Sequence, residues 1–305
     1  MKQKANKNQK DTVFRRIFHN KERLLELYNA INHTNYDNPN DLTIKTLHGK
    51  TFLGMRNDLS FIFDDELNLY EHNSTPCPNI ALRDLLYIAS SYREMYSLKD
   101  LYKSSPIKIP APRFFVFYNG TLQLPDRFEY RLSDMFIKET ANPSLELKVT
   151  VLNVNEGRNK ELMESCKSLR DYSLFVGKVR KYTQEAKLKN SKDYFMSHKK
   201  ELIEKAVIKA IDECITENIL RDYFIQNRQE AIDMSTLECT AEIYYKAVSE
   251  ENYDKGVSQG VNDTNSFYSW LFSNGRDSDA KKAASDKAYF DKLYKEYESA
   301  KSKKM

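Results

Sequence analysis

The chain has 305 residues, of which 40% are hydrophobic and 30% charged, a balance that can bury a core but is too polar for a membrane protein. It contains no apolar run of about 18 residues and no apolar segment behind its basic N-terminus, so neither a transmembrane helix nor a secretory signal is expected, and a cytoplasmic location is predicted. The net charge of +4 at pH 7 is compatible with a polyanionic partner without requiring one.

The N-terminal region begins with polar, Lys-rich residues 1–10, which predict a disordered basic arm. Apolar side chains then recur at helical spacing over residues 11–31. Asp11 stands at the start of this predicted helix. We expect it to cap the helix, with a role in an active site as the alternative.

Three strands are expected next, because apolar and polar residues alternate in short segments. The segments are LTIKTL, RNDLSFIF and LNLYEHN. The acidic cluster Asp64-Asp65-Glu66 lies between the last two and predicts a short hairpin connection.

A helix and two further strands complete the predicted core. Pro76 and Pro78 precede the helical segment 79–96, and residues 108–120 and 145–155 are apolar enough for buried strands. The residues expected to face mostly inward from the helix are Ile80, Leu82, Leu86, Ile88 and Ala89. The order of helix, three strands, helix, strand and strand predicts an α/β or α+β core.

From about residue 160 the pattern becomes helical, with strongly amphipathic segments. We therefore divide the chain into the arm, a core over 11–160, a helical extension over 161–250 and a C-terminal helical tail over 251–305.

The residues that suggest chemistry are Asp58 on the second strand and Glu71 and Asn73 on the third. Side chains alternate along a strand, so Glu71 and Asn73 share a face, and either hairpin register brings Asp58 to that face. Two carboxylates at close range favour a cation between them, and hard oxygen ligands select Mg²⁺, with Mn²⁺ or Ca²⁺ as alternatives. The scattered cysteines and histidines give zinc little support.

The segments around these residues resemble those of the recombination-promoting nuclease and transposase family, within the PD-(D/E)XK nuclease superfamily. The resemblance rests on RNDLSFIFDDELNLYEHNSTPCPNIALRDLLYIASSYREMY, followed by IPAPRFFVFYNG, by the helical segment AIDECITENILRDYFIQNRQEAI and by the tail NGRDSDAKKAASDKAYFDKLYKEY. It implies an αβββαβ core, Mg²⁺-dependent cleavage of DNA and a cytoplasmic bacterial protein. Asp58 corresponds to the superfamily Asp, and Glu71 to the acidic residue of its E-x-K or E-x-Q pair.

One position departs from that pattern. The third member of the motif, Lys or Gln in such proteins, is Asn73 here, and its amide reaches one methylene less far than that of Gln. The backbone carbonyl of His72 is a further predicted metal ligand, while the His72 side chain is expected to pack on the opposite face. Arg83 is a secondary candidate for contacting phosphate, with an ion-paired or solvated arginine as the alternative.

Two functions follow as hypotheses. The first is a metal-dependent DNA endonuclease that promotes recombination or transfer of mobile elements through strand breaks. The second is a protein that retains the nuclease fold and binds DNA or a protein partner without cutting. A homodimer would suit cleavage of both strands, but no residue pattern indicates a dimer interface.

Overall fold

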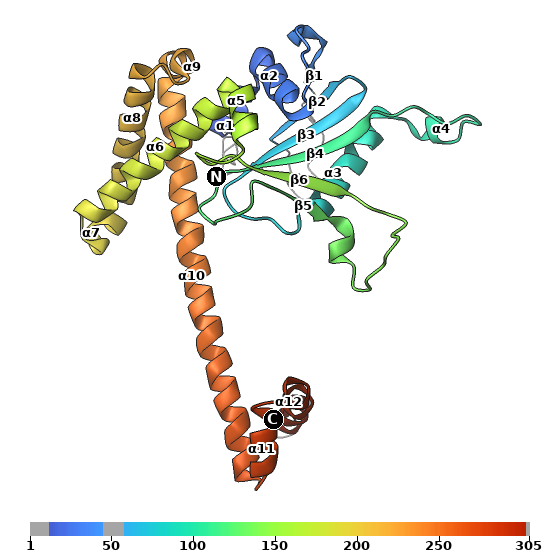
Figure 1. Ribbon diagram of the computed structural model, residues 1–305, viewed down its shortest axis with the longest axis vertical. Coiled ribbons are helices and arrows are strands. Elements are labelled where there is room, and N and C mark those ends of the chain that lie inside the picture. The colour runs from blue at the N-terminus through green and yellow to red at the C-terminus, as the bar shows by residue number, and fades with distance from the viewer. Residues whose placement is uncertain (1–11, 45–57, 303–305) are drawn as a thin grey trace, which may run out of the picture. The chain divides into compact units, whose positions relative to one another are not determined.

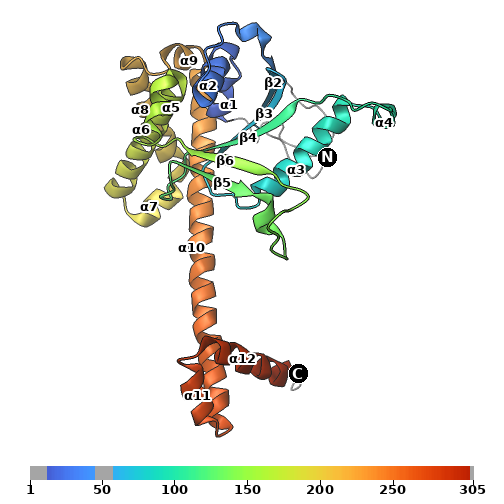
Figure 2. The same ribbon diagram turned by 45° about the vertical axis from the view of Figure 1, so that its right-hand side comes forward.

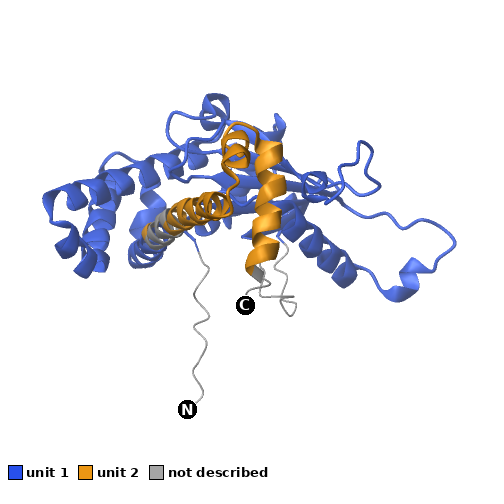
Figure 3. Ribbon diagram, turned by 90° about the horizontal axis from the view of Figure 1, so that it is seen from below, with its two compact units in different colours: residues 1–242 blue, residues 243–305 orange. Residues whose placement is uncertain are grey.

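A computed structural model describes residues 12–44 and 58–302, and the chain divides into the compact units Met1–Glu242 and Ile243–Met305 (Figure 3). Asp11, the basic arm and half of the first predicted strand lie outside the described residues.

The helix predicted over 11–31 is two helices, α1 (Val13–Phe18) and α2 (Lys21–Asn32). Thr12 caps α1, since its side chain accepts a hydrogen bond from the Arg15 N–H at 3.1 Å. Asn20 caps α2 by accepting from the Arg23 N–H at 3.0 Å. A new cap within the apolar pattern interrupts the helix without changing which side chains face inward.

The core of the first unit is a six-stranded mixed sheet with the order β1-β2-β3-β4-β6-β5 (Figure 1). The strands are β1 (Thr43–Ile44), β2 (Leu59–Phe63), β3 (Glu66–Asn73), β4 (Ala111–Tyr118), β5 (Arg127–Arg131) and β6 (Lys148–Asn153). Strands β1, β2 and β3 form an antiparallel meander, whereas β3, β4 and β6 run parallel to one another. Edge strand β5 was not predicted, because the segment RFEYR is polar and half exposed.

The connection between β2 and β3 is tighter than predicted. Phe63 pairs with Glu66, so Asp64 and Asp65 alone make the turn, and Glu66 belongs to β3. Both turn residues have positive φ, 50° and 56°, as in the two-residue turns that match the twist of a hairpin.

Helices cover both faces of the sheet (Figure 2). One face packs on α3 (Ile80–Met95) and holds Leu69, Val116 and Val151 in one apolar cluster. The opposite face carries aromatic side chains, including Phe117, whose ring lies 5.0 Å from that of Phe14 on α1.

The orientation of α3 corrects part of the prediction. Ile80 and Ile88 face inward as expected, but Leu82 is 43% and Leu86 is 39% exposed, and Ala89 is also exposed. The buried face instead includes Asp84. The helix is rotated so that its polar residues 83 and 84 approach β3, a contact that apolar periodicity cannot indicate.

The rest of the described residues form helices and the loops that join them. The helices are α4 (Leu98–Leu101), α5 (Lys160–Ser165), α6 (Lys167–Lys189), α7 (Lys192–Ser197), α8 (Lys199–Thr216), α9 (Arg221–Gln226), α10 (Arg228–Ser273), α11 (Asp277–Ala283) and α12 (Lys287–Ser302), with short 3-10 helices at Pro39–Asp41 and Leu132–Met135. The border between the two units falls inside α10. The second unit has its own core, in which α11 and α12 contribute to a cluster around Phe267 and Leu271.

Candidate functional site

The candidate residues lie at one edge of the sheet, where the parallel strands β3, β4 and β6 end. Asn73 pairs with Tyr118, and Tyr118 pairs with Asn153. The carboxyl ends of these strands therefore form one line. In open α/β sheets, this is the edge at which ligands bind.

Asp58 lies just before β2, at the same edge. The register ends at Leu59 and Tyr70, so one further step pairs Asp58 with Glu71, one of the two predicted partners. Its Oδ2 accepts a hydrogen bond from the His72 backbone N–H at 2.8 Å. Since only a Cα–C and a C–N bond join Glu71 Cα to that nitrogen, the Asp58 oxygen lies within about 6 Å of Glu71 Cα.

Glu71 faces α3 and forms an ion pair there. Its Oε1 accepts a hydrogen bond from Arg83 Nη2 at 2.7 Å, with the Glu71 side chain 10% and the Arg83 side chain 36% exposed. Of the alternatives for Arg83, the ion pair is confirmed. The guanidinium thus supplies a positive charge where the sequence predicts a metal ion.

Asp84 is a site residue that the sequence analysis missed. It is 4% exposed. Its burial and the nearby Glu71 carboxylate raise the pKa of Asp84 well above its usual range, while Arg83 acts in the opposite direction. The carboxyl group of Asp84 therefore lies near Glu71, and the environment favours the protonated form of Asp84. The only signal in the sequence was its adjacency to Arg83.

Asn73 shares the α3 face with Glu71, as predicted. It lines a small cavity of about 10 Å³ together with Cys77, Val116 and Tyr118. Its Nδ2 is buried and has no hydrogen-bond partner among the described residues. A buried donor without a partner costs free energy, so this amide could donate a hydrogen bond to a bound group.

His72 packs on the opposite face, as predicted for its side chain. Its ring stacks on Phe14 at 5.2 Å, and Nε2 lies 2.8 Å from the Tyr172 hydroxyl. Burial, helped by the Arg180 guanidinium, lowers the pKa of His72 to about 4. The neutral ring therefore anchors the peptide whose N–H binds Asp58. The backbone carbonyl of His72 stays a predicted metal ligand.

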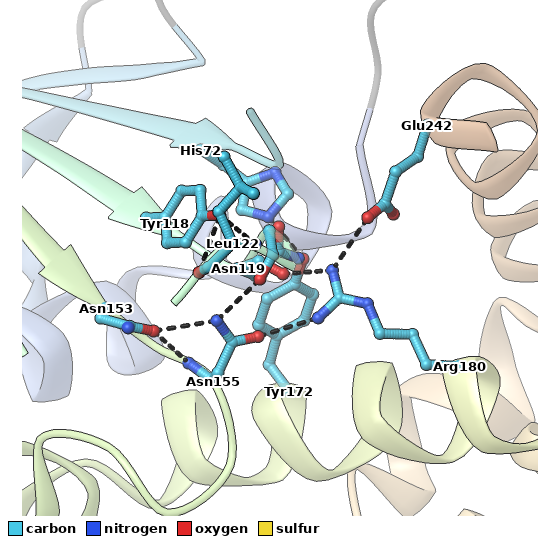
Figure 4. A network of polar contacts seen from close by, with 10 residues as sticks. His72, Tyr118, Asn119, Leu122, Asn153, Asn155, Tyr172, Arg180 and Glu242 are labelled. Carbon is cyan, nitrogen blue, oxygen red and sulfur yellow. Dashed lines mark hydrogen bonds and ion pairs between the residues drawn. The ribbon is translucent and has the colours of Figure 1, made fainter. Parts of the chain in front are cut away.

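A polar network extends from His72 along the strand ends (Figure 4). Asn119 Nδ2 donates to the Tyr172 hydroxyl at 3.1 Å, which leaves that hydroxyl to donate to His72 Nε2. Arg180 on α6 donates to the Asn119 carbonyl oxygen and, at 2.8 Å, to Asn155 Oδ1. The sequence analysis gave Asn119 no functional role, because its partners lie 53 and 61 residues away along the chain.

Glu238 on α10 is another acidic residue near Asp58 that the sequence analysis missed. Its Oε1 accepts a hydrogen bond from the Val13 N–H at 3.2 Å. Burial raises the pKa of Glu238 to about 8, and the carboxylates of Asp58 and Glu242 add to the effect. A second carboxyl group therefore lies close to Asp58, and at neutral pH it is mostly protonated.

The side chains at this site offer the type of ligand atom, carboxylate oxygen, that a hard divalent cation prefers. Asp58 and Glu71 offer carboxylate oxygens from neighbouring positions at the end of the β2–β3 hairpin. Within residues 12–44 and 58–302, no three His, Cys, Asp or Glu side chains gather closely enough to hold a metal ion by themselves. A metal would thus need backbone or water oxygens as well.

In the part of the chain that the structure describes, no helix is both long and apolar enough to span a membrane. Comparisons of the chain with protein-family profiles, with curated proteins and with solved structures find no match.

Proposed function

We propose that this protein is a Mg²⁺-dependent endonuclease that hydrolyses phosphodiester bonds of DNA in the cytoplasm, with a PD-(D/E)XK core formed by the first helices, β1 to β3, α3 and β4. The observation that carries the proposal is the β2–β3 register, which puts Asp58 next in line to pair with Glu71 at the carboxyl edge of the sheet. The parallel β3-α3-β4 crossover and the resemblance of the hairpin to recombination-promoting nucleases support it.

Asp58 and Glu71 would hold the ion, with the His72 carbonyl as a further ligand. When bound, such an ion lowers the pKa of a coordinated water and stabilises charge on the scissile phosphate. The His72 N–H orients the Asp58 carboxylate through its 2.8 Å hydrogen bond. Asn73, with its unpartnered Nδ2, is suited to donate a hydrogen bond to the attacking water or to a phosphate oxygen.

Arg83 has two roles in this proposal. Without the metal, it compensates the buried Glu71 carboxylate at 2.7 Å. When a cation takes over that compensation, the guanidinium becomes available for a phosphate oxygen, for which its paired N–H donors are well matched.

A protein that binds DNA or a protein partner without cutting is the second candidate. Two observations favour it. Glu71 is already neutralised by Arg83, and Asn73 turns its amide toward a small cavity beneath α3. On this reading, the retained carboxylates stabilise the fold and do not bind a metal.

The test is incubation of the purified protein with supercoiled plasmid under Mg²⁺, Mn²⁺ and Ca²⁺, and without metal. The endonuclease proposal expects nicked or linear DNA with Mg²⁺ or Mn²⁺ and intact DNA in the chelated control. Retarded but uncut plasmid under every metal would favour the second candidate.

A further inference from the structure

A cavity of about 400 Å³ opens at the carboxyl ends of β4 and β6, within the first unit. Its lining includes Asn119, Asn153, Asn155, Arg158, Ser173 and Arg180. The volume lies in the range of sites that hold small organic ligands. The lining combines amide and guanidinium groups with one carboxylate, that of Glu156, so the ligand it suits is polar, and the two arginines favour negative charge on it.

Arg180 is the central cation of this cavity. Its guanidinium donates mainly to uncharged oxygens, those of Asn155 and Asn119, and the Glu242 carboxylate lies farther away at 3.4 Å. Its positive charge is therefore only loosely compensated. Arg158 lies on the cavity rim, 3.3 Å from Asp126 and 39% exposed, so a ligand could reach it without rearranging the core.

Three buried polar atoms of the lining residues lack a hydrogen-bond partner within the described residues. They are Asn119 Oδ1, Ser173 Oγ and Arg180 Nε, and Asn119 and Ser173 are 5% and 4% exposed. Unsatisfied buried groups are unfavourable. Asn119 Oδ1 can only accept, so it favours a ligand that carries donors, such as the amino and imino groups of a nucleobase.

The cavity also lies near the candidate cleavage site. Asn73, Tyr118 and Asn153 are in register across β3, β4 and β6, and neighbouring strands lie about 4.8 Å apart. Asn153 is therefore about 10 Å from Asn73. That separation places the cavity within a few nucleotides of the candidate cleavage site along a nucleic acid strand.

We propose that this cavity binds one nucleotide of the substrate strand, which flanks the scissile phosphate, with Arg158 and Arg180 contacting its phosphate and Asn119 and Ser173 its base. The inference deepens the proposed endonuclease function and rests on it for the source of the nucleotide. A nucleotide that enters a cavity is unstacked, so single-stranded or locally opened DNA is the preferred substrate.

The test is calorimetric titration of the full chain, in chelator and without divalent metal, with deoxynucleoside 5′-monophosphates, deoxyadenosine and inorganic phosphate. The monophosphates should bind saturably, and the nucleoside and phosphate at least about tenfold more weakly. A single-stranded pentanucleotide should bind more tightly than a mononucleotide. Arg158→Gln should weaken mononucleotide binding about tenfold, as loss of a charge-assisted hydrogen bond implies.

Arg113→Gln is the matched control. Arg113 lies near the amino end of β4, away from the strand ends that form the cavity. It is 41% exposed and pairs with Glu66 at 2.8 Å, so its loss removes the same charge without touching the cavity. Ser173→Ala, a small buried change, should also weaken mononucleotide binding.

Absence of saturable mononucleotide binding, or equal weakening by Arg158→Gln and Arg113→Gln, would overturn the site. Inorganic phosphate binding as tightly as mononucleotide would overturn the nucleotide assignment, and mononucleotide binding more tightly than the pentanucleotide would overturn the strand as its source. The titration contains no divalent metal, so it does not depend on cleavage. If the protein binds mononucleotide but does not cut DNA, the endonuclease proposal fails and the nucleotide site stands.

Discussion

Replacing Arg83 by Gln removes the cation that compensates Glu71. The pair is 2.7 Å long, with Glu71 10% and Arg83 36% exposed. Breaking a fully buried pair costs about 3–5 kcal/mol and breaking an exposed one about 0.2–1 kcal/mol. The exposure of Arg83 places this pair between them, so we expect the free energy of unfolding to fall by about 2 kcal/mol, which lowers Tm by about 4–8 °C for a unit of this size.

The same variant reports on metal binding. If Glu71 is a ligand, Arg83 competes with the metal, so Mg²⁺ should raise the Tm of Arg83→Gln more than that of the wild type. Free metal at about one hundred times its Kd would restore about 2.7 kcal/mol. The assay is thermal unfolding with Mg²⁺ and with chelator, and Arg113→Gln, which loses a 2.8 Å pair of similar exposure, is the control. Equal Mg²⁺ shifts in all three proteins, or none, would refute the reasoning.

Three further outcomes are expected. Asn73→Gln should raise the single-turnover nicking rate, because the longer amide reaches farther toward the water or phosphate; a slower variant would show that the site is adapted to Asn. In the wild type, the free energy of unfolding should fall by up to about 3 kcal/mol between pH 6.5 and pH 4, and His72→Asn should abolish this fall, as measured by urea denaturation. This loss arises because the folded-state pKa of His72, about 4, lies below that of the unfolded chain, so stability is present above pH 6.5 and falls with acidification. Glu238→Gln should stabilise the protein by up to about 4 kcal/mol at pH 8.5 and not at pH 4.5. The raised folded-state pKa of Glu238, about 8, means that the stability of the wild type falls as pH rises through this range, and equal effects at both pH values would contradict that cause.

Much of the sheet was predictable because its signals are local. Alternation along β3 and a tight acidic turn are enough to put Glu71 and Asn73 on one face, and the parity of the hairpin brings Asp58 to the same edge. The buried run of β4, from Phe114 to Tyr118, also follows from composition alone.

The residues that the sequence analysis missed depend on contacts distant in sequence. Apolar spacing favoured Leu82 and Leu86 as inward residues of α3, but the inward face includes Asp84, because Arg83 pairs with Glu71 on β3. Asn119 contacts Tyr172 and Arg180 on α6, which is far from it in the sequence. Neither contact leaves a periodic signal in its own segment.

The most direct test of the central claim is single-turnover nicking of supercoiled plasmid at saturating Mg²⁺ by the wild type, Asp58→Asn and Glu71→Gln. Each substitution keeps the shape of the side chain and removes one anionic ligand. We predict Mg²⁺-dependent nicking by the wild type and a loss of at least about a hundredfold in each variant, with folding confirmed by circular dichroism. Nicking that persists at the wild-type rate in either folded variant would contradict the assignment of Asp58 and Glu71 as the metal-holding pair.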